Sequence, residues 1–274
     1  MKINKKIVGI TMWSLAGLVL IVSLGFAGKE QAASKCKGLR IRVADQTGNL
    51  FIEPKDVVEV LNTRGKRVKG SAMQDINTLL LEKIVYTIPF VEKAEVYSTI
   101  DGYVNIDAWQ RNPVVRVINN DNEHFYIDEN GEFMPVTEKF TSPVVVASGF
   151  IFDDYAAKSL KYAVPHLSDS TAIPVLVQVN EIAQFLKGDE FWDAQIEQIY
   201  VNEKSEIELI PRVGNHSILL GNTSNLKEKM DNLMIFYKEG AIKTGWNRYS
   251  MINLKYKDQV IGTVRNAKIT NKSN

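Results

Sequence analysis

The segment IPFVEKAEVYSTIDGYVNI, residues 88–106, restricts the fold more than any other part of the sequence. Pro89 lacks a backbone N–H and clashes with the turn before it, so a helix that reaches this point must end. Apolar and polar residues then alternate twice, as they do in strands with one buried face. Asp101 and Gly102 separate the two alternations and suit a tight hairpin turn, where positive φ is needed. On the first strand, the side chains predicted to share one face are those of Ala94, Val96 and Ser98. On the second strand they are those of Val104, Ile106 and Ala108.

The residues before this segment predict one strand and two helices. LRIRV, residues 39–43, alternates as a strand does. Residues 53–65 predict a helix that has Pro54 in its first turn and a glycine just past its end. A second helix is predicted to begin after Asn77, because asparagine is a favourable N-cap. The resulting order, β-α-α-β-β, is that of a small compact module, which we assign to residues 38–112.

The rest of the sequence predicts a second domain, residues 113–266, and a polar tail, residues 267–274. Short strand-like runs separated by turn residues fill most of this domain. Residues 173–187 and a segment with Ser224 as its N-cap have helical periodicity. The fold class is therefore α+β, with the small module followed by a mainly antiparallel β domain that also contains helices.

The N-terminus predicts a single transmembrane helix. Residues 7–27 carry no charge, and a helix of that length spans about 31 Å, close to the thickness of a bilayer core. Three lysines in residues 1–6 keep this end in the cytoplasm by the positive-inside rule. Residues 28–37 then form a polar linker, and the bulk of the chain lies outside the inner membrane. The alternative is a cleaved signal peptide, whose apolar region is usually shorter.

The composition excludes some functions. The chain has 33 Lys and Arg and 32 Asp and Glu, so it lacks the excess of basic residues with which proteins bind nucleic acid electrostatically. Its one cysteine, Cys36, cannot form an intrachain disulfide and is predicted to be a lone thiol in the linker.

Catalytic motifs are missing from the sequence. The three histidines, His124, His166 and His216, are widely spaced and form no metal-binding pattern, and no glycine-rich phosphate loop occurs. His216 is predicted to lie in a turn that enters a strand. The acidic pairs are predicted to be solvated residues of turns and helix starts. We therefore expect no catalytic, cofactor or metal site. The acidic pairs in question are Asp128–Glu129, Asp153–Asp154 and Asp189–Glu190.

The ordered set of segments resembles the bacterial cell-division family FtsQ/DivIB. IPFVEKAEV, the hairpin and the strand that leads to RNPVV follow the pattern of that family, and FYIDENGEFMP resembles its next passage. The family residues matched here are Pro89, Phe90, Val91, Ala94, Val96, Arg111, Pro113 and Val114.

The resemblance implies a POTRA module, a polypeptide-binding fold, and a following β domain. It implies a single-pass inner-membrane protein that has a cytoplasmic N-terminus and a periplasmic bulk. Such a protein is a non-enzymatic divisome scaffold that binds FtsB and FtsL and helps control septal peptidoglycan synthesis by FtsW and FtsI. Two alternatives stay open: another POTRA-type membrane-anchored assembly factor, and a secreted hydrolase with a non-standard site.

The last predicted strand supplies a candidate binding site. Residues 249–256 and 259–264 predict the final two strands, with Tyr256 closing the first. A last strand at a sheet edge offers unpaired backbone groups to an incoming chain. The resemblance implies FtsB binding here, with Tyr256 at the interface and Ile261 and Thr263 beside it. The alternative is that Tyr256 is an ordinary aromatic residue of a sheet face.

Overall fold

The computed structural model describes residues 12–22, 34–44, 48–64, 67–158, 173–241, 243 and 245–265. The chain divides into two compact units, Met1–Gln110 and Arg111–Asn274. Residues 12–22 are helical, and none of the helices in the described ranges is long and apolar enough to cross a membrane. The other residues of the predicted span, 7–11 and 23–27, lie outside the described residues, as do the tails predicted at each end of the chain.

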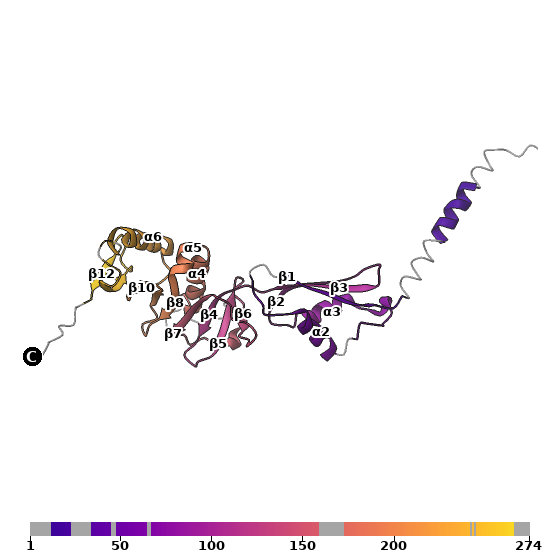
Figure 1. The fold of residues 1–274 in the computed structure, drawn as a ribbon, viewed down its shortest axis with the longest axis horizontal. Coiled ribbons are helices and arrows are strands. Elements are labelled where there is room, and N and C mark those ends of the chain that lie inside the picture. Colours follow the sequence, from indigo (N-terminus) through magenta and orange to yellow (C-terminus); the bar gives the residue numbers. More distant parts are fainter. Residues whose placement is uncertain are drawn as a thin grey trace, which may run out of the picture. The chain divides into compact units, whose positions relative to one another are not determined.

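The first unit folds in the predicted β-α-α-β-β order, with one short 3₁₀ helix added. Its sheet has the order β1-β3-β2, in which β1 runs parallel and β2 antiparallel to β3. The helices cover one face of this sheet (Figure 1). The elements are β1 (Gly38–Ala44), α2 (Pro54–Thr63), η1 (Met73–Asp75), α3 (Thr78–Val85), β2 (Val91–Ser98) and β3 (Tyr103–Gln110).

Local signals set these boundaries. Asn77 caps α3, since its Oδ1 accepts a hydrogen bond from the Leu80 N–H at 2.9 Å. The predicted inward residues of the hairpin are buried, except Ser98, which is exposed. The turn is wider than predicted, because four residues, 99–102, separate β2 from β3, and among them only Gly102 has positive φ, at 84°. It closes with a bond from the Thr99 N–H to the Tyr103 carbonyl and one from the Gly102 N–H to the Thr99 carbonyl, both 3.0 Å.

Cys36 corrects the predicted linker. Its side chain is 2 % exposed and belongs to the core of the first unit. The Cys36 N–H donates to the Ser71 carbonyl at 2.8 Å, and Lys35 pairs with Ala72 in an isolated β-bridge. The cysteine is therefore a packed core residue, because tertiary hydrogen bonds draw the chain onto the module two residues before β1 begins.

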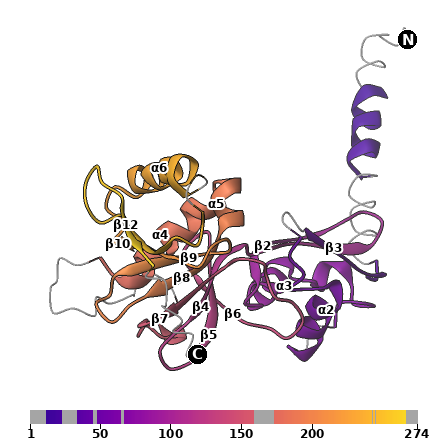
Figure 2. The ribbon, with the colours of Figure 1, turned by 60° about the vertical axis from the view of Figure 1, so that its left-hand side comes forward.

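The second unit is built on a nine-stranded sheet in the order β12-β11-β10-β9-β8-β7-β4-β5-β6. Five antiparallel and three parallel pairings join its strands. The helices lie on one side of the sheet and enclose the core there (Figure 2). The strands are β4 (Pro113–Ile118), β5 (His124–Asp128), β6 (Phe133–Pro135), β7 (Val145–Gly149), β8 (Ile196–Val201), β9 (Ile207–Pro211), β10 (Ser217–Gly221), β11 (Tyr249–Asn253) and β12 (Ile261–Val264).

The helices of the second unit differ from the prediction in several places. A short helix, α5 (Glu190–Gln195), precedes β8 and was not predicted. Helix α6 (Leu226–Phe236) starts after Asn225 rather than Ser224, and Asn225 is left-handed at φ 55° with no side-chain cap. A π-helical turn, η4 (Tyr237–Ala241), extends its end. The remaining helices are η2 (Tyr155–Ala157) and α4 (Val175–Lys187), the latter matching the predicted residues 173–187.

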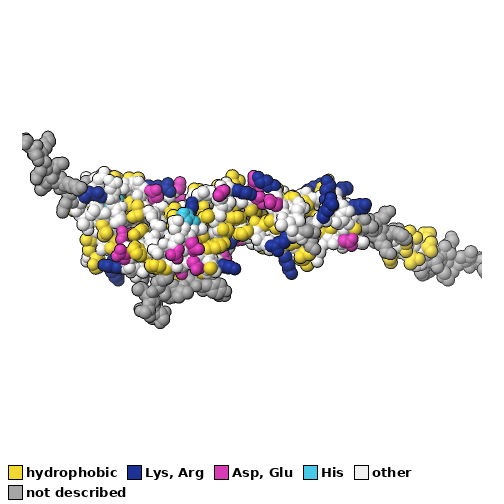
Figure 3. Space-filling view, turned by 90° about the horizontal axis from the view of Figure 1, so that it is seen from below, with side chains coloured by type: hydrophobic (Ala, Val, Ile, Leu, Met, Phe, Trp, Pro, Cys, Tyr) yellow, Lys and Arg dark blue, Asp and Glu magenta, His cyan; other side chains and the backbone are white. Residues whose placement is uncertain are grey.

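The surface carries both signs of charge. On the face shown in Figure 3, acidic and basic side chains both occur along the molecule, and hydrophobic side chains lie between them. This mixture agrees with the near-equal numbers of acidic and basic residues in the sequence.

Candidate partner-binding edge

Strand β12 forms one edge of the nine-stranded sheet, as predicted. Among the strands that the structure describes, it pairs only with β11, antiparallel, with Asn253 opposite Ile261 and Ile252 opposite Gly262. The Arg265 N–H just beyond it donates to the Arg248 carbonyl at 2.9 Å. Because backbone groups alternate along a strand, those of Thr263 also face β11, whereas those of Gly262 and Val264 are directed to the free edge. This edge can therefore pair with an added strand.

Strand β6, at the opposite edge, is closed to such pairing. The Asp128 N–H bonds to the Glu132 carbonyl, so Phe133 and Pro135 are the positions directed outward. The Phe133 N–H is occupied by the Lys158 carbonyl at 2.7 Å, and proline has no N–H to offer. Short edge strands and prolines prevent unwanted strand addition. The two edges thus differ, and β12 is the edge that the described part of the chain leaves unpaired.

The side chains of β12 present apolar surface to solvent. Ile261 is 43 % exposed and Val264 is 52 % exposed, and Thr263 is also exposed. Gly262 lies under the ring of Tyr249, since an added Cβ would meet two ring carbons at 2.7 Å. That ring packs edge-on against Phe236 of α6, with the centroids 5.2 Å apart. The strand is thus held by an aromatic residue on its helix side, and no strand among the described residues pairs with its outer side.

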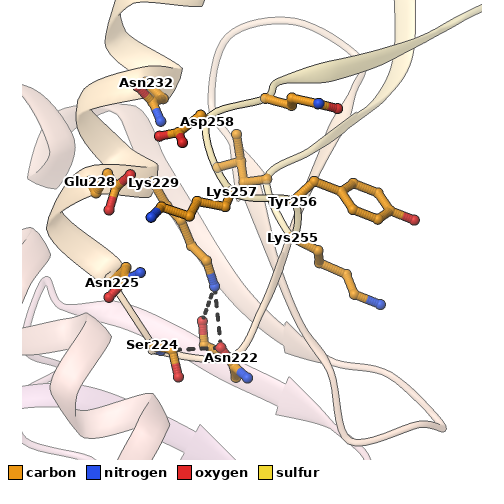
Figure 4. A pocket seen from close by; sticks show the side chains of 12 residues that line it. Asn222, Ser224, Asn225, Glu228, Lys229, Asn232, Lys255, Tyr256, Lys257 and Asp258 are labelled. Carbon is orange, nitrogen blue, oxygen red and sulfur yellow. Dashed lines mark hydrogen bonds between the residues drawn. The ribbon is translucent and has the colours of Figure 1, made fainter.

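Tyr256 does not close a strand as predicted, because β11 ends at Asn253. The tyrosine lies in the loop between β11 and β12, where the Gln259 N–H donates to its carbonyl at 3.3 Å. Its side chain is 55 % exposed. Figure 4 shows Tyr256 directed away from α6, whereas Lys257 and Asp258 are directed toward the helix. The ring is therefore free to contact a partner beside the edge.

A polar hollow of about 230 Å³ separates this loop from the start of α6. Below it, Lys229 donates to the carbonyls of Leu220 and Asn222, at 3.0 and 2.8 Å, and burial lowers the pKa of its amine. Lys255 forms an ion pair with Glu206, whose hydrogen bond raises the pKa of Lys255 and lowers that of Glu206. The Lys255–Glu206 pair thus holds the start of the loop that carries Tyr256, and Lys229 holds the start of α6 to the end of β10.

His216 helps to hold the edge from within the core. It is 4 % exposed, so the predicted turn histidine is a buried residue at the entry to β10. Its Nε2 lies 3.0 Å from the Tyr237 hydroxyl, and its ring stacks against Trp246 at 6.4 Å. Arg265 bonds to the neighbouring Asn215 carbonyl, which joins the end of β12 to this cluster. Burial lowers the pKa of His216, and the nearby positive charge of Arg265 lowers it further; burial also raises the pKa of Tyr237.

We predict that His216 makes the second unit sensitive to mild acid. Its pKa is lower in the folded protein than the ordinary value of about 6.5, so the unfolded chain takes up the proton first as the pH falls. Stability should therefore drop as the pH is lowered from about 7.5 through about 6.5 and level off below the folded pKa. Thermal melts of wild type and His216→Gln test this, because glutamine keeps an acceptor for Tyr237 and cannot titrate. Equal slopes in both proteins would contradict the assignment.

The acidic pairs have structural roles, but not all of them are solvated as predicted. Asp128 is 2 % exposed and accepts the Arg111 Nε–H at 2.7 Å, so it is buried rather than a solvated turn residue. Asp189 caps α5 and Asp154 caps η2. Among the described residues, no group of three or more His, Cys, Asp or Glu side chains could hold a metal ion.

Two features of the β12 edge were not predicted from the sequence: the exposed side chain of Val264 and the packing of Tyr249 on Gly262. Val264 is more exposed than Ile261, and its place within the predicted strand, residues 259–264, could have indicated it. The packing of Tyr249 on Gly262 has no local signal, since it depends on the register between β11 and β12.

The comparison with family models places this geometry in a known group. Residues 112–263, more than half of the chain, match the model described as FtsQ/DivIB, C-terminal related. The chain belongs to the FtsQ/DivIB family. Residues 34–109 match a POTRA-like domain. A search of curated proteins found no match. The match to the FtsQ/DivIB model ends within β12, so the candidate edge lies largely inside the region that is characteristic of the family.

Proposed function

We propose that the chain is a non-enzymatic scaffold of the division machinery whose β12 edge binds a strand of FtsB. Membership of the FtsQ/DivIB family indicates a cell-division protein. The proposed complex includes FtsL and helps control septal peptidoglycan synthesis by FtsW and FtsI. Its proposed place is the inner membrane, with residues 7–27 as a single anchor and the two folded units in the periplasm, because the apolar run follows three lysines.

The difference between the two edges of the large sheet carries this proposal. β6 has no N–H to offer among its outward positions, whereas Gly262 and Val264 of β12 direct theirs to the free edge. Backbone pairing supplies affinity in such complexes, and the alternating side chains supply selectivity. Ile261 and Thr263 share one face of β12, and Tyr256 projects from the loop beside it. An extended polypeptide is the ligand that fits these features.

Replacing Tyr256 by alanine should weaken FtsB binding by about thirtyfold. An exposed aromatic anchor at an interface is typically worth about 2 kcal/mol. Titration calorimetry of residues 29–274 with the periplasmic part of FtsB measures the loss, and a thermal melt checks the fold. Tyr86→Ala is the matched control, because Tyr86 is a similarly exposed tyrosine, at 45 %, at the C-cap of α3 in the other unit. Unchanged affinity with an unchanged melt would remove Tyr256 from the site.

A further inference from the structure

The tip of the β2–β3 hairpin carries an unusually exposed apolar side chain. Ile100 is 89 % exposed, the highest value among the large hydrophobic residues of the described chain. The two hydrogen bonds that close the turn hold it in place on either side. An isolated exposed apolar residue is common and needs no explanation by itself. The residues around this one give it a chemical context.

Two cations and an aromatic ring surround the tip. The Lys37 N–H donates to the Gly102 carbonyl at 2.8 Å, and the lysine side chain runs alongside Gly102. The Arg40 guanidinium lies 3.8 Å from the centroid of the Tyr103 ring. Lys37 forms no ion pair with any described residue. Tyrosine and long basic side chains are the types that combine an apolar body with a polar end.

The tip also carries one opposing charge, that of Asp101. The carboxylate accepts hydrogen bonds from the Thr99 hydroxyl, at 2.5 Å, and from Arg40, at 2.7 Å. The Thr99 hydrogen bond, supported by Arg40, lowers the pKa of Asp101, so this acid stays charged. Lys37 and Arg40 together still leave the tip with one net positive charge.

This end of the first unit is also where the chain arrives from the apolar run. Lys37 is bonded to the turn itself and lies ten positions after Ala27, the predicted end of the run. A chain of that length spans at most about 35 Å. A bilayer that held residues 7–27 would therefore lie within reach of the tip.

We propose that the hairpin tip docks on an anionic lipid surface, with Ile100 inserted among the headgroups and Lys37 and Arg40 bound to their phosphates. An apolar residue flanked by cations and an interfacial tyrosine matches the layered polarity of a bilayer surface. The contribution of each cation comes from the negative potential of the leaflet and falls with added salt. The proposal concerns a surface of the first unit and is independent of strand addition at β12.

Vesicle binding of residues 29–274 tests the proposal. This fragment omits the apolar run and retains both buried cores, whose residues lie between Cys36 and Leu254. Flotation with phosphatidylglycerol-containing vesicles at low salt should show binding that is weaker with pure phosphatidylcholine and is lost at high salt. Ile100→Glu should lower the partition constant about tenfold or more. Lys37→Gln should lower it about fivefold, and Asp101→Asn should raise it.

The controls distinguish insertion of the hairpin tip from non-specific binding of the protein to vesicles. Leu79→Glu removes another exposed apolar residue, 69 % exposed on α3, and should leave binding unchanged. Lys227→Gln removes an exposed lysine from the second unit and should also have little effect. Absence of binding to anionic vesicles, or equal losses in the Ile100 and Leu79 variants, would overturn the proposal. Loss of FtsB binding in Ile100→Glu with vesicle binding intact would overturn it too, because the tip would then be a protein contact.

Discussion

Replacing Asp128 by asparagine should lower the free energy of unfolding of the second unit by about 3–5 kcal/mol, because it leaves a buried guanidinium without its carboxylate. Arg111 and Asp128 have side chains that are 13 % and 2 % exposed, and they meet at 2.7 Å. Arg111 also donates to the Phe133 carbonyl at 3.1 Å, while Asp128 accepts from the N–H groups of Asn130 and Glu132. The pair therefore joins the start of β4 to the β5–β6 turn, and its loss affects several hydrogen bonds at once.

Urea denaturation followed by tryptophan fluorescence measures the effect. Adding Arg111→Met to Asp128→Asn should recover most of the loss, because the unpaired charge is gone and asparagine still accepts from the turn. Asp231→Asn is the control, since its pair with Lys227 is 60 % and 80 % exposed and such pairs contribute at most about 0.5 kcal/mol. Equal destabilisation by Asp128→Asn and Asp231→Asn would refute a structural role for the buried pair.

Replacing Val264 by proline should weaken FtsB binding by roughly 30- to 150-fold, or about 2–3 kcal/mol, and leave the fold intact. The Val264 N–H is directed away from β11, so proline removes a donor that an added strand needs and none that the sheet uses. Val264→Thr keeps both the N–H and the branched shape and should bind normally.

Proline at the neighbouring position, Thr263, should affect the stability of the fold as well as binding. The backbone groups of Thr263 face β11, and its carbonyl accepts a hydrogen bond from the Ser250 hydroxyl at 3.3 Å. Thr263→Pro should therefore lower the melting temperature as well as the affinity. Calorimetric titration and thermal melts of all three variants separate the two effects. Normal binding by a well-folded Val264→Pro protein would show that the partner does not pair with this edge.

The first unit could be predicted almost completely because its signals are local. The Asn77 cap, the stop at Pro89 and the alternation on either side of Gly102 each act within a few residues. The prediction failed at Cys36, where a contact with Ser71, far along the chain, draws the segment into the core. The hairpin turn differed in detail because glycine alone takes the left-handed conformation there.

The second unit was predictable in its strands and not in their arrangement. Parallel pairings such as that of β10 with β11 join segments separated by a helix, and no sequence period records such a neighbour. The buried state of Asp128 likewise depends on Arg111, 17 positions away in the sequence. For the candidate site, the prediction that the last strand lies at a sheet edge was confirmed. The loop position of Tyr256 was not predicted, because β11 is three residues shorter than its alternation suggested.

The unequal edges of the large sheet also limit how an assembly can grow. If β12 takes a strand as proposed and β6 is closed, each chain accepts one strand at one end, which favours a one-to-one complex. An added strand would create a new outer edge of its own. The partner must therefore supply the feature that ends the sheet, through a short strand, a proline or a covering helix. The control of stoichiometry would then be divided between the two proteins, with the starting point in this chain and the stop in its partner.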